Sequence, residues 1–404
     1  FYFSSPSAAE IVIFDETHSD LVMQVLDKDS SVFIFKTRPE EIWLGLGVLR
    51  NFFKGFNILR LKEIFGFSKK NFKSRLRIIF CIYLEGCLRT INPKGVITYI
   101  DNCQKFCWLA RNCNKFPFIS IQNGFRLSYD ADSPSSYYAQ HLFCFGNREK
   151  EVFPKLGYKV ENIYPVGSLS SSINFQKDLD IKELKYDILI VSCWRGNIGF
   201  SKDVEDSMRA MKLMDQQLFN YLKQVNIKAA VILRSERDSD QWFMPEIGMN
   251  EEDYYLSIYG DSIEIIDTDL TERNVYSLMQ SSDVIVSGFS TTCLLEAYAI
   301  GKKVLYCNFC ETDKYHIDFD KEIVFKGNKN SFKEFKSRLD DLRDTSNDNY
   351  LKDHESLMGY YMPNPLLSPV RDEIKKKISL IIYSDIKDLR SVDRLGKGKI
   401  NDAQ

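Results

Sequence analysis

The stretch Asp283-Val-Ile-Val-Ser-Gly-Phe-Ser-Thr-Thr-Cys-Leu-Leu-Glu296-Ala-Tyr-Ala-Ile-Gly301-Lys-Lys-Val-Leu305 places a short apolar run, a turn and a helix-length segment before a second apolar run. It predicts a strand at 283–288, a helix at 291–300 and a strand at 303–307. Strands that alternate with helices form parallel sheets with right-handed crossovers. The stretch therefore indicates a doubly wound α/β domain.

The same rhythm is found in the chain before this stretch. Earlier apolar runs predict strands in the segments 10–16, 31–36, 95–102, 116–124 and 141–146, and later ones at 186–192, 228–234 and 262–267, with helices at 204–224 and 272–280. A turn-rich segment at 165–172 separates the two halves. We expect an α/β fold with two Rossmann-like doubly wound domains facing across a cleft: one at 1–168, a second at 185–335, and a helical segment (336–404) that packs back on the first domain.

Composition narrows the classes of function. The 404 residues carry 54 Lys and Arg against 56 Asp and Glu, a net charge of -2, whereas nucleic-acid binders usually have a basic excess. No run approaches the ~20 apolar residues of a membrane span. Ten scattered Cys suit a reducing compartment, so we expect a cytoplasmic protein that binds no nucleic acid.

The turn after the strand at 283–288 is a candidate nucleotide site. Backbone N–H groups at a helix N-terminus, together with hydroxyl donors, favour phosphate, and a Glu one turn later can accept hydrogen bonds from a ribose. The nucleotide-binding candidates are Gly288, Ser290, Thr291, Thr292 and Glu296, with Arg195 and Arg234 after neighbouring strands. An ordinary capped helix, with surface arginines, explains the same residues.

Polar residues also follow two predicted strands of the first half. Unpaired burial of such groups is costly, so they either pair with one another or bind a polyhydroxylated ligand. The candidates for acceptor or sugar binding are Asp101, Asn102, Gln122, Asn123, Gly124 and Arg126. A simple tight turn at Asn123-Gly124 is the alternative.

Four carboxylates are catalytic candidates. Asp15 and Glu16 follow the first strand, and Glu236 and Asp238 lie in the second half. Transfer of a group to a hydroxyl needs a base or a nucleophile, and a carboxylate can serve as either. Solvated surface charge is the competing interpretation, above all for Glu236 and Asp238.

The sequence offers little for a metal or a bound cofactor. It contains four His and a single C-x-x-C at Cys307–Cys310 with no second pair, which is too little for a zinc site. The sequence also lacks a Walker A motif and a complete dinucleotide fingerprint. We expect no cofactor and no metal.

Residues 51–80 combine eight basic residues and seven Phe with one acid, Glu63. A basic, aromatic and amphipathic segment can lie on an anionic membrane surface. It can equally be a solvated helix face, or hold an anionic acceptor. A peripheral contact with the inner face of the membrane is therefore one interpretation of this segment.

Several runs resemble bacterial surface carbohydrate biosynthesis proteins of capsule and O-antigen loci. The runs are Val96–Arg111, Phe118–Arg126, Phe143–Gly146 and Tyr164–Ser168. The first run contains the motif Ile-Asp-Asn, and the second contains the motif Ile-Gln-Asn-Gly-x-Arg. The chain is similar over about 10–310 to GT-B glycosyltransferases that use CMP-activated ulosonic acids, such as retaining β-Kdo and pseudaminic acid transferases. Ser235-Glu236 stands where related capsule and sialyl transferases often carry a His-Pro pair that contacts the CMP phosphate.

The resemblance implies transfer of an ulosonic acid from its CMP derivative to an oligosaccharide or lipid-linked glycan acceptor of a surface polysaccharide, with retention. It also implies that the domain at 1–168 binds the acceptor and that the domain at 185–335 binds the nucleotide sugar. CMP carries one phosphate, so no metal is required for the leaving group. Two alternatives stay open: a transferase with another donor (a UDP- or GDP-sugar, or a CDP-polyol), and a catalytically silent glycan-binding module.

Overall fold

The computed structural model describes residues 1–37, 41–65, 72–126, 137–178, 184–194, 202–234, 248–267, 275–288, 291–310 and 320–395. Contacts divide the chain into two compact domains. The first contains Phe1–Asn123, Ala131–Leu169 and Pro369–Gln404, and the second contains Gly124–Asp130 and Ser170–Ser368. Residues 336–368 thus belong to the second domain. The chain returns to the first domain at Pro369, whereas the sequence analysis expected the segment from residue 336 to pack there.

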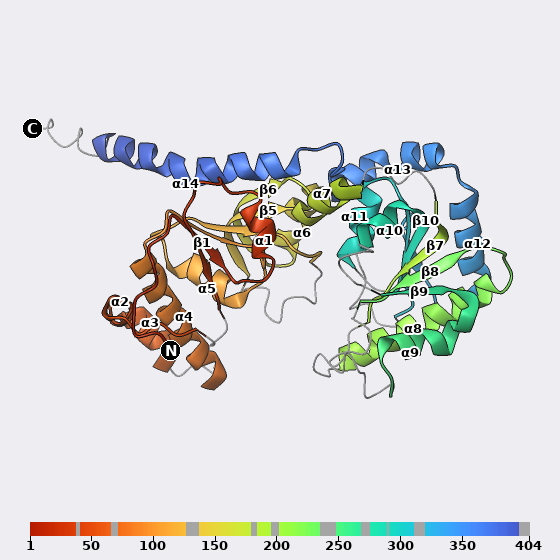
Figure 1. The fold of residues 1–404 in the computed structure, drawn as a ribbon, viewed down its shortest axis with the longest axis horizontal. Helices are drawn as coiled ribbons and strands as arrows, with labels where there is room; N and C mark the ends of the chain where they lie inside the picture. The colour runs from red at the N-terminus through yellow and green to blue at the C-terminus, as the bar shows by residue number, and fades with distance from the viewer. Residues whose placement is uncertain are drawn as a thin grey trace, which may run out of the picture. The chain divides into compact units, whose positions relative to one another are not determined.

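The first domain is built on a six-stranded parallel sheet with the order β2-β1-β3-β4-β5-β6 (Figure 1). Its strands are β1 (Ile11–Phe14), β2 (Val32–Phe35), β3 (Gly95–Thr98), β4 (Phe118–Ile121), β5 (Tyr138–Cys144) and β6 (Lys159–Pro165). The helices between them are α1 (Ser19–Met23), α2 (Leu46–Lys54), α3 (Ile58–Phe65), α4 (Phe72–Ile91), α5 (Gln104–Asn112) and α6 (Asn147–Lys155). The strand order reverses between β1 and β3.

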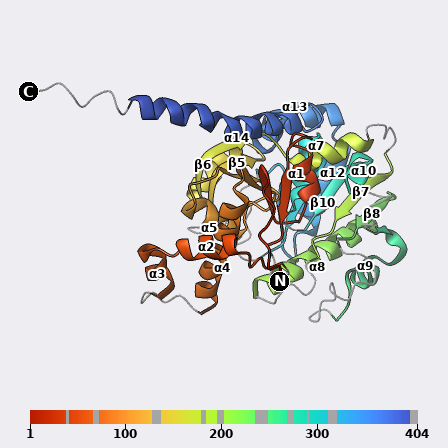
Figure 2. The ribbon, with the colours of Figure 1, turned by 60° about the vertical axis from the view of Figure 1, so that its left-hand side comes forward.

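Alternate residues of these strands point to opposite faces of the sheet. On one face, Val12 and Phe14 of β1 pack with buried residues of α4 and α5, including Leu88 and Phe106. The opposite face is approached by the last helix, α14 (Val370–Leu395). A Cβ atom on Gly95 would lie 2.9 Å from Cγ1 of Ile382, so this glycine permits the close approach of α14 to β3. In Figures 1 and 2, α14 runs along the first domain.

An ion triad centred on the buried carboxylate of Glu85 joins α3 and α4. The guanidinium of Arg60 lies 2.7 Å from Oε2 of Glu85, and Arg89 lies 2.7 Å from Oε1 of the same carboxylate. Arg60 also donates to the carbonyls of Gly55 and Asn112. One of the eight basic residues in 51–80 is therefore part of the interior.

The second domain has a six-stranded parallel sheet with the order β12-β11-β10-β7-β8-β9. Counted within the domain, this is the 3-2-1-4-5-6 order of dinucleotide-binding folds. Its strands are β7 (Tyr186–Val191), β8 (Ala229–Ile232), β9 (Glu264–Ile266), β10 (Ser282–Ser287), β11 (Lys303–Asn308) and β12 (Val324–Lys326). Its helices are α7 (Leu169–Asn174), which begins at the domain boundary, α8 (Lys202–Leu222), α9 (Glu251–Tyr259), α10 (Val275–Gln280), α11 (Thr292–Ala299), α12 (Phe332–Asp344) and α13 (Asn347–Tyr361).

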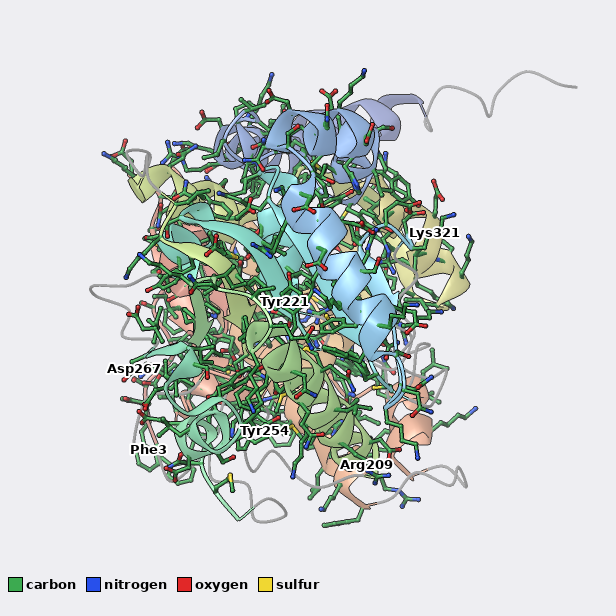
Figure 3. All side chains as sticks on the ribbon, turned by 90° about the vertical axis from the view of Figure 1, so that its right-hand side faces the viewer. Phe3, Arg209, Tyr221, Tyr254, Asp267 and Lys321 are labelled. Atoms are coloured by element: carbon green, nitrogen blue, oxygen red, sulfur yellow. The ribbon has the colours of Figure 1, made fainter. Side chains whose placement is uncertain are left out.

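Buried polar pairs fix the helices of this domain. Asp215 of α8 accepts hydrogen bonds from the hydroxyls of Tyr254 (2.6 Å) and Tyr259 (2.8 Å) of α9. Tyr221 of α8 donates to Asp340 of α12 over 2.8 Å, and Figure 3 shows Tyr221 beside that helix (Figure 3). These bonds join the α8–α9 layer and α12 into one packed unit.

The topology confirms the predicted α/β class with two doubly wound parallel sheets, the domain content expected for the GT-B fold. The strands β10 and β11 and the helix α11 fall within two residues of the predicted bounds. Two strands were not predicted. β6 lies at the sheet edge and consists of exposed and part-buried residues, and β12 has only three residues.

Candidate functional site

Ligands of open α/β sheets bind beyond the carboxyl ends of the strands, where the strand order reverses. In the first domain this point lies between β1 and β3. Asp15 follows β1 directly and has a φ of 82°, a left-handed conformation that Asp tolerates better than most residues. Its carboxylate is buried and accepts hydrogen bonds from the Thr17 hydroxyl (2.6 Å), the Thr17 N–H (3.1 Å) and the Thr37 hydroxyl (2.5 Å). Asp15 is therefore rigidly held.

Glu16 is the next residue, and its surroundings differ. Its side chain is partly buried. Atom Oε2 is buried and has no hydrogen-bond partner among the residues that the structure describes. A buried carboxylate oxygen without a donor is costly, and such atoms call for an explanation by function or by a bound group. The two adjacent acids thus differ in their contacts: Asp15 is engaged through both oxygens, whereas no described donor contacts Oε2 of Glu16.

The other strand-end polar groups of the first domain pair with the protein. Asp101 is fully buried, and it accepts hydrogen bonds from the Asn123 N–H (3.2 Å) and the Tyr137 hydroxyl (3.0 Å). The amide oxygen of Gln122 accepts from the Phe145 N–H over 3.0 Å. Asn102 is exposed at this edge. The contact between Asp101 and Asn123 joins two of the candidates, whereas Gln122 pairs with the backbone of Phe145, which is not a candidate.

Gly124 and Arg126 belong to a different neighbourhood from the one expected. The turn that contains them is part of the second domain, where the N–H of Phe125 donates to the Thr292 hydroxyl over 3.1 Å. A Cβ atom on Gly124 would lie 3.6 Å from that same hydroxyl oxygen. Arg126 is buried. One acceptor candidate, Gly124, therefore lies beside a nucleotide candidate, Thr292.

In the second domain the strand order reverses between β7 and β10. The chain beyond β7 contributes Cys193, whose Sγ lies 2.9 Å from Oγ of Ser287 at the end of β10. Gly288 follows, and a Cβ atom there would lie 3.0 Å from Sδ of Met214 and 3.6 Å from the Met211 Cα. This glycine is thus needed for close packing of the β10 end against α8, a reason that does not involve a ligand.

Helix α11 starts just after this reversal. Thr291 is its N-cap residue, and Thr292 is its first residue. Glu296, one turn later, is buried and accepts a hydrogen bond from the Tyr276 hydroxyl over 3.1 Å. That hydroxyl also lies 2.9 Å from Oγ of Ser170. The structure therefore brings Thr291, Thr292 and Glu296 together in the first turns of one helix, as the sequence analysis expected.

Of the remaining candidate site residues, only Arg234 lies within the described part of the chain. Arg234 is exposed after β8, its guanidinium donates to the carbonyl of Trp194 over 2.9 Å, and its N–H donates to Glu251 over the same distance. Arg195, Glu236, Asp238 and Ser290 lie outside the described residues. Within the described ranges, no group of three or more His, Cys, Asp or Glu side chains could hold a metal ion.

Sequence reasoning missed two features at the carboxyl edge of the first sheet. Thr37, two residues beyond β2, holds Asp15. Glu149, in the first turn of α6, is fully buried, and burial raises its pKa to about 7 although the adjacent Arg148 acts in the opposite direction. A threonine after an apolar run and an Arg-Glu pair are too common to be recognised as site residues without the fold.

No family model and no curated protein matches the sequence. Solved structures are similar over most of the chain. UDP-GlcNAc 2-epimerase from Neisseria meningitidis, bound to UDP-GlcNAc, is 12% identical, with 93% of this chain and 99% of that chain covered and a TM-score of 0.49. A variant of the wall teichoic acid polymerase TagF is 12% identical (95% and 90% covered, TM-score 0.47), and MurG from Acinetobacter baumannii is 10% identical (93% and 99%, TM-score 0.44). Similarities of this size say nothing about the activity of this chain.

Among the described helices, none is both long enough and apolar enough to cross a bilayer.

Proposed function

We propose that this chain is a GT-B glycosyltransferase that moves a sugar from a nucleotide donor to a surface glycan. The observation that carries the proposal is the strand order of the second domain, because it sets the first turn of α11 beside the reversal between β7 and β10. Nucleotides bind at such points in α/β sheets. Thr291, Thr292 and the buried Arg126 supply donors suited to a phosphate, and Glu296 supplies an acceptor for a ribose hydroxyl.

For the donor we propose a CMP-ulosonate, on the basis of the resemblance in 96–126 to transferases of this class. A single phosphate needs neither a diphosphate-binding loop nor a metal. In this proposal Thr291, Thr292 and Arg126 would supply the hydrogen-bond donors for that phosphate. A glycan acceptor would bind to the first domain, near Asn102 and Asn123.

For the chemistry we propose Glu16 as the nucleophile of a retaining double displacement. A carboxylate oxygen of Glu16 bonds to the anomeric carbon while the bond from that carbon to the CMP phosphate oxygen breaks. The acceptor hydroxyl then displaces Glu16 from the anomeric carbon, and its proton passes to a second carboxylate, for which the sequence offers Glu236 and Asp238. Asp15 orients the turn that presents Glu16.

Thermal unfolding with CMP, CDP, UMP, UDP, GMP and GDP, each with and without Mg²⁺, tests the proposal. A ligand at 100 times its Kd raises stability by about 2.7 kcal/mol. We expect a metal-independent shift with CMP, reduced in Thr292→Val and Glu296→Gln and retained in Glu16→Gln. A shift with a diphosphate nucleotide alone would refute the CMP donor. No shift with any nucleotide would favour a silent binding module.

A further inference from the structure

Three helices of the first domain carry large apolar side chains in solvent. In α2, Leu46 is 87% exposed and Phe53 is 68% exposed. In α3, Ile58 and Leu59 are 72% and 76% exposed, and Phe72 at the start of α4 is 74% exposed. Single exposed apolar residues are ordinary, whereas several of this size on neighbouring helices mark an interaction surface. We name these five residues the α2–α4 apolar surface.

The helices that carry this surface are held firmly on their inner sides. α2 and α3 both contact α4, and Figures 1 and 2 show the three helices side by side. The inward side of α3 contains Arg60, which pairs with Glu85, and the buried Ile64. Since Arg60 and Ile64 are one turn apart, Ile58 and Leu59 remain on the outer side. Their exposure thus follows from how α3 is anchored.

Basic side chains lie among these apolar ones. Arg50 and Lys54 of α2, Lys62 of α3 and Lys73 of α4 are all exposed. Over 46–80 the sequence contains only one acidic residue, Glu63. In α2, Leu46, Arg50 and Phe53 recur at helical spacing, so apolar and cationic groups share one side of the helix. This pattern is complementary to a lipid bilayer, which is apolar at its acyl chains and can carry anionic headgroups.

We propose that the α2–α4 apolar surface docks this protein peripherally on an anionic lipid bilayer. Phe53, Ile58, Leu59 and Phe72 would enter the headgroup–acyl boundary, and Arg50, Lys54, Lys62 and Lys73 would contact anionic headgroups. The proposal goes beyond glycosyl transfer and does not require it. Each basic side chain contributes about fivefold to membrane partitioning at low salt, and burial of the apolar side chains adds to this.

Co-sedimentation of the full chain with vesicles is the direct test. The probes are vesicles of phosphatidylcholine alone and vesicles with 30 mol% phosphatidylglycerol, used at about 50 mM and 500 mM NaCl. We expect binding to the anionic vesicles that falls at least tenfold at the higher salt. Phe53→Ser/Leu59→Ser is expected to weaken binding at least tenfold, and Lys54→Glu/Lys62→Glu at least twentyfold.

Matched control variants change exposed residues elsewhere. Lys155→Glu alters an exposed lysine of α6, and Leu367→Ser alters an 83% exposed leucine of the second domain. Both are expected to bind vesicles like the unaltered protein. All changed side chains are exposed, and unchanged thermal unfolding of each variant checks that it folds.

Two results would overturn the proposal. One is the absence of binding to anionic vesicles, or binding that the surface variants leave unchanged. The other is a concentration-dependent dimer in sedimentation velocity that Phe53→Ser/Leu59→Ser dissociates while lipid binding is absent, since the surface would then join two copies of the chain. Neither readout uses nucleotide or turnover, so failure here is distinguishable from failure of the proposed transferase activity.

Discussion

The hydroxyl of Thr37 donates a hydrogen bond to Oδ2 of Asp15 over 2.5 Å. The two residues lie beyond the ends of neighbouring parallel strands, β2 and β1, and the bond fixes the side chain of Asp15 at the start of the turn that carries Glu16. With Thr17 on the other carboxylate oxygen, Asp15 is held from both sides. The orientation of Glu16 therefore depends on a residue 21 positions away in the sequence.

We predict that Glu16→Gln lowers kcat by at least about a thousandfold and leaves donor affinity nearly unchanged. The amide cannot form the glycosyl ester or accept a proton, yet it fills the same space. Steady-state kinetics with a CMP-sugar, combined with CMP titration, measures both quantities. Turnover within tenfold of the unaltered enzyme would remove Glu16 from the mechanism.

Asp15→Asn is expected to have a smaller effect, about ten- to a hundredfold on kcat. Asn tolerates the positive φ at this position, so the substitution changes hydrogen bonding with little added backbone strain. If Asp15→Asn abolishes turnover and Glu16→Gln does not, the roles of the two acids are reversed.

Thr37→Val tests the positioning role without touching either acid. Valine has the shape of threonine and removes one donor from a buried carboxylate, which costs about 1–3 kcal/mol of unfolding free energy. We expect kcat to fall about tenfold with KM little changed, and Thr37→Ser to recover most of the loss. Full activity in Thr37→Val would mean that Thr17 suffices to hold Asp15.

Much of the fold could be predicted because it depends on local pattern. The runs Ile11–Phe14 and Ser282–Ser287 are short and largely apolar, so both strands were predicted from the sequence. Which elements become neighbours in the folded domain could not be predicted from the sequence. Thr37 reaching Asp15 depends on which strands are neighbours, and Phe125 reaching Thr292 joins residues 167 positions apart. The order of the strands depends on the packing of the whole domain, so the sequence of a single segment does not determine it.

The stability of the protein is expected to fall as pH rises towards 7. Burial raises the pKa of Asp215 from 3.8 to about 7, although two tyrosine hydroxyls oppose the shift. Between these values the folded state holds a proton that the unfolded state has lost, so unfolding free energy falls by about 1.4 kcal/mol per pH unit and is constant above pH 7. Glu149 contributes in the same direction above pH 4.5.

Urea unfolding of Asp215→Asn between pH 5 and 8 checks this origin. The variant has no titrating group at position 215, so its unfolding free energy should depend less steeply on pH. The pH dependence that remains should come from Glu149. Glu149→Gln is the companion variant. A slope equal to that of the unaltered protein would show that Asp215 stays ionised in the folded state.

Arg60→Met is predicted to destabilise the first domain by about 3 kcal/mol. The substitution leaves the buried Glu85 with Arg89 alone, and removal of one member of a buried ion group leaves charge uncompensated. Urea unfolding measures the loss. The double variant Arg60→Met/Glu85→Gln should recover part of it, whereas equal loss in both would point to packing of Arg60 on Trp108, whose ring centre lies 5.3 Å away.

The return of α14 to the first domain has a consequence for synthesis. Helix α14 contacts Gly95 through Ile382 and Asp27 through Lys375. In each pair the ribosome adds the α14 residue more than 250 residues after its partner. Domains generally fold as units as the chain emerges from the ribosome. The second domain can therefore close while the first still lacks its final helix. A chain stopped before residue 370 would leave the α14-facing side of the first sheet uncovered, as a surface for chaperones or proteases.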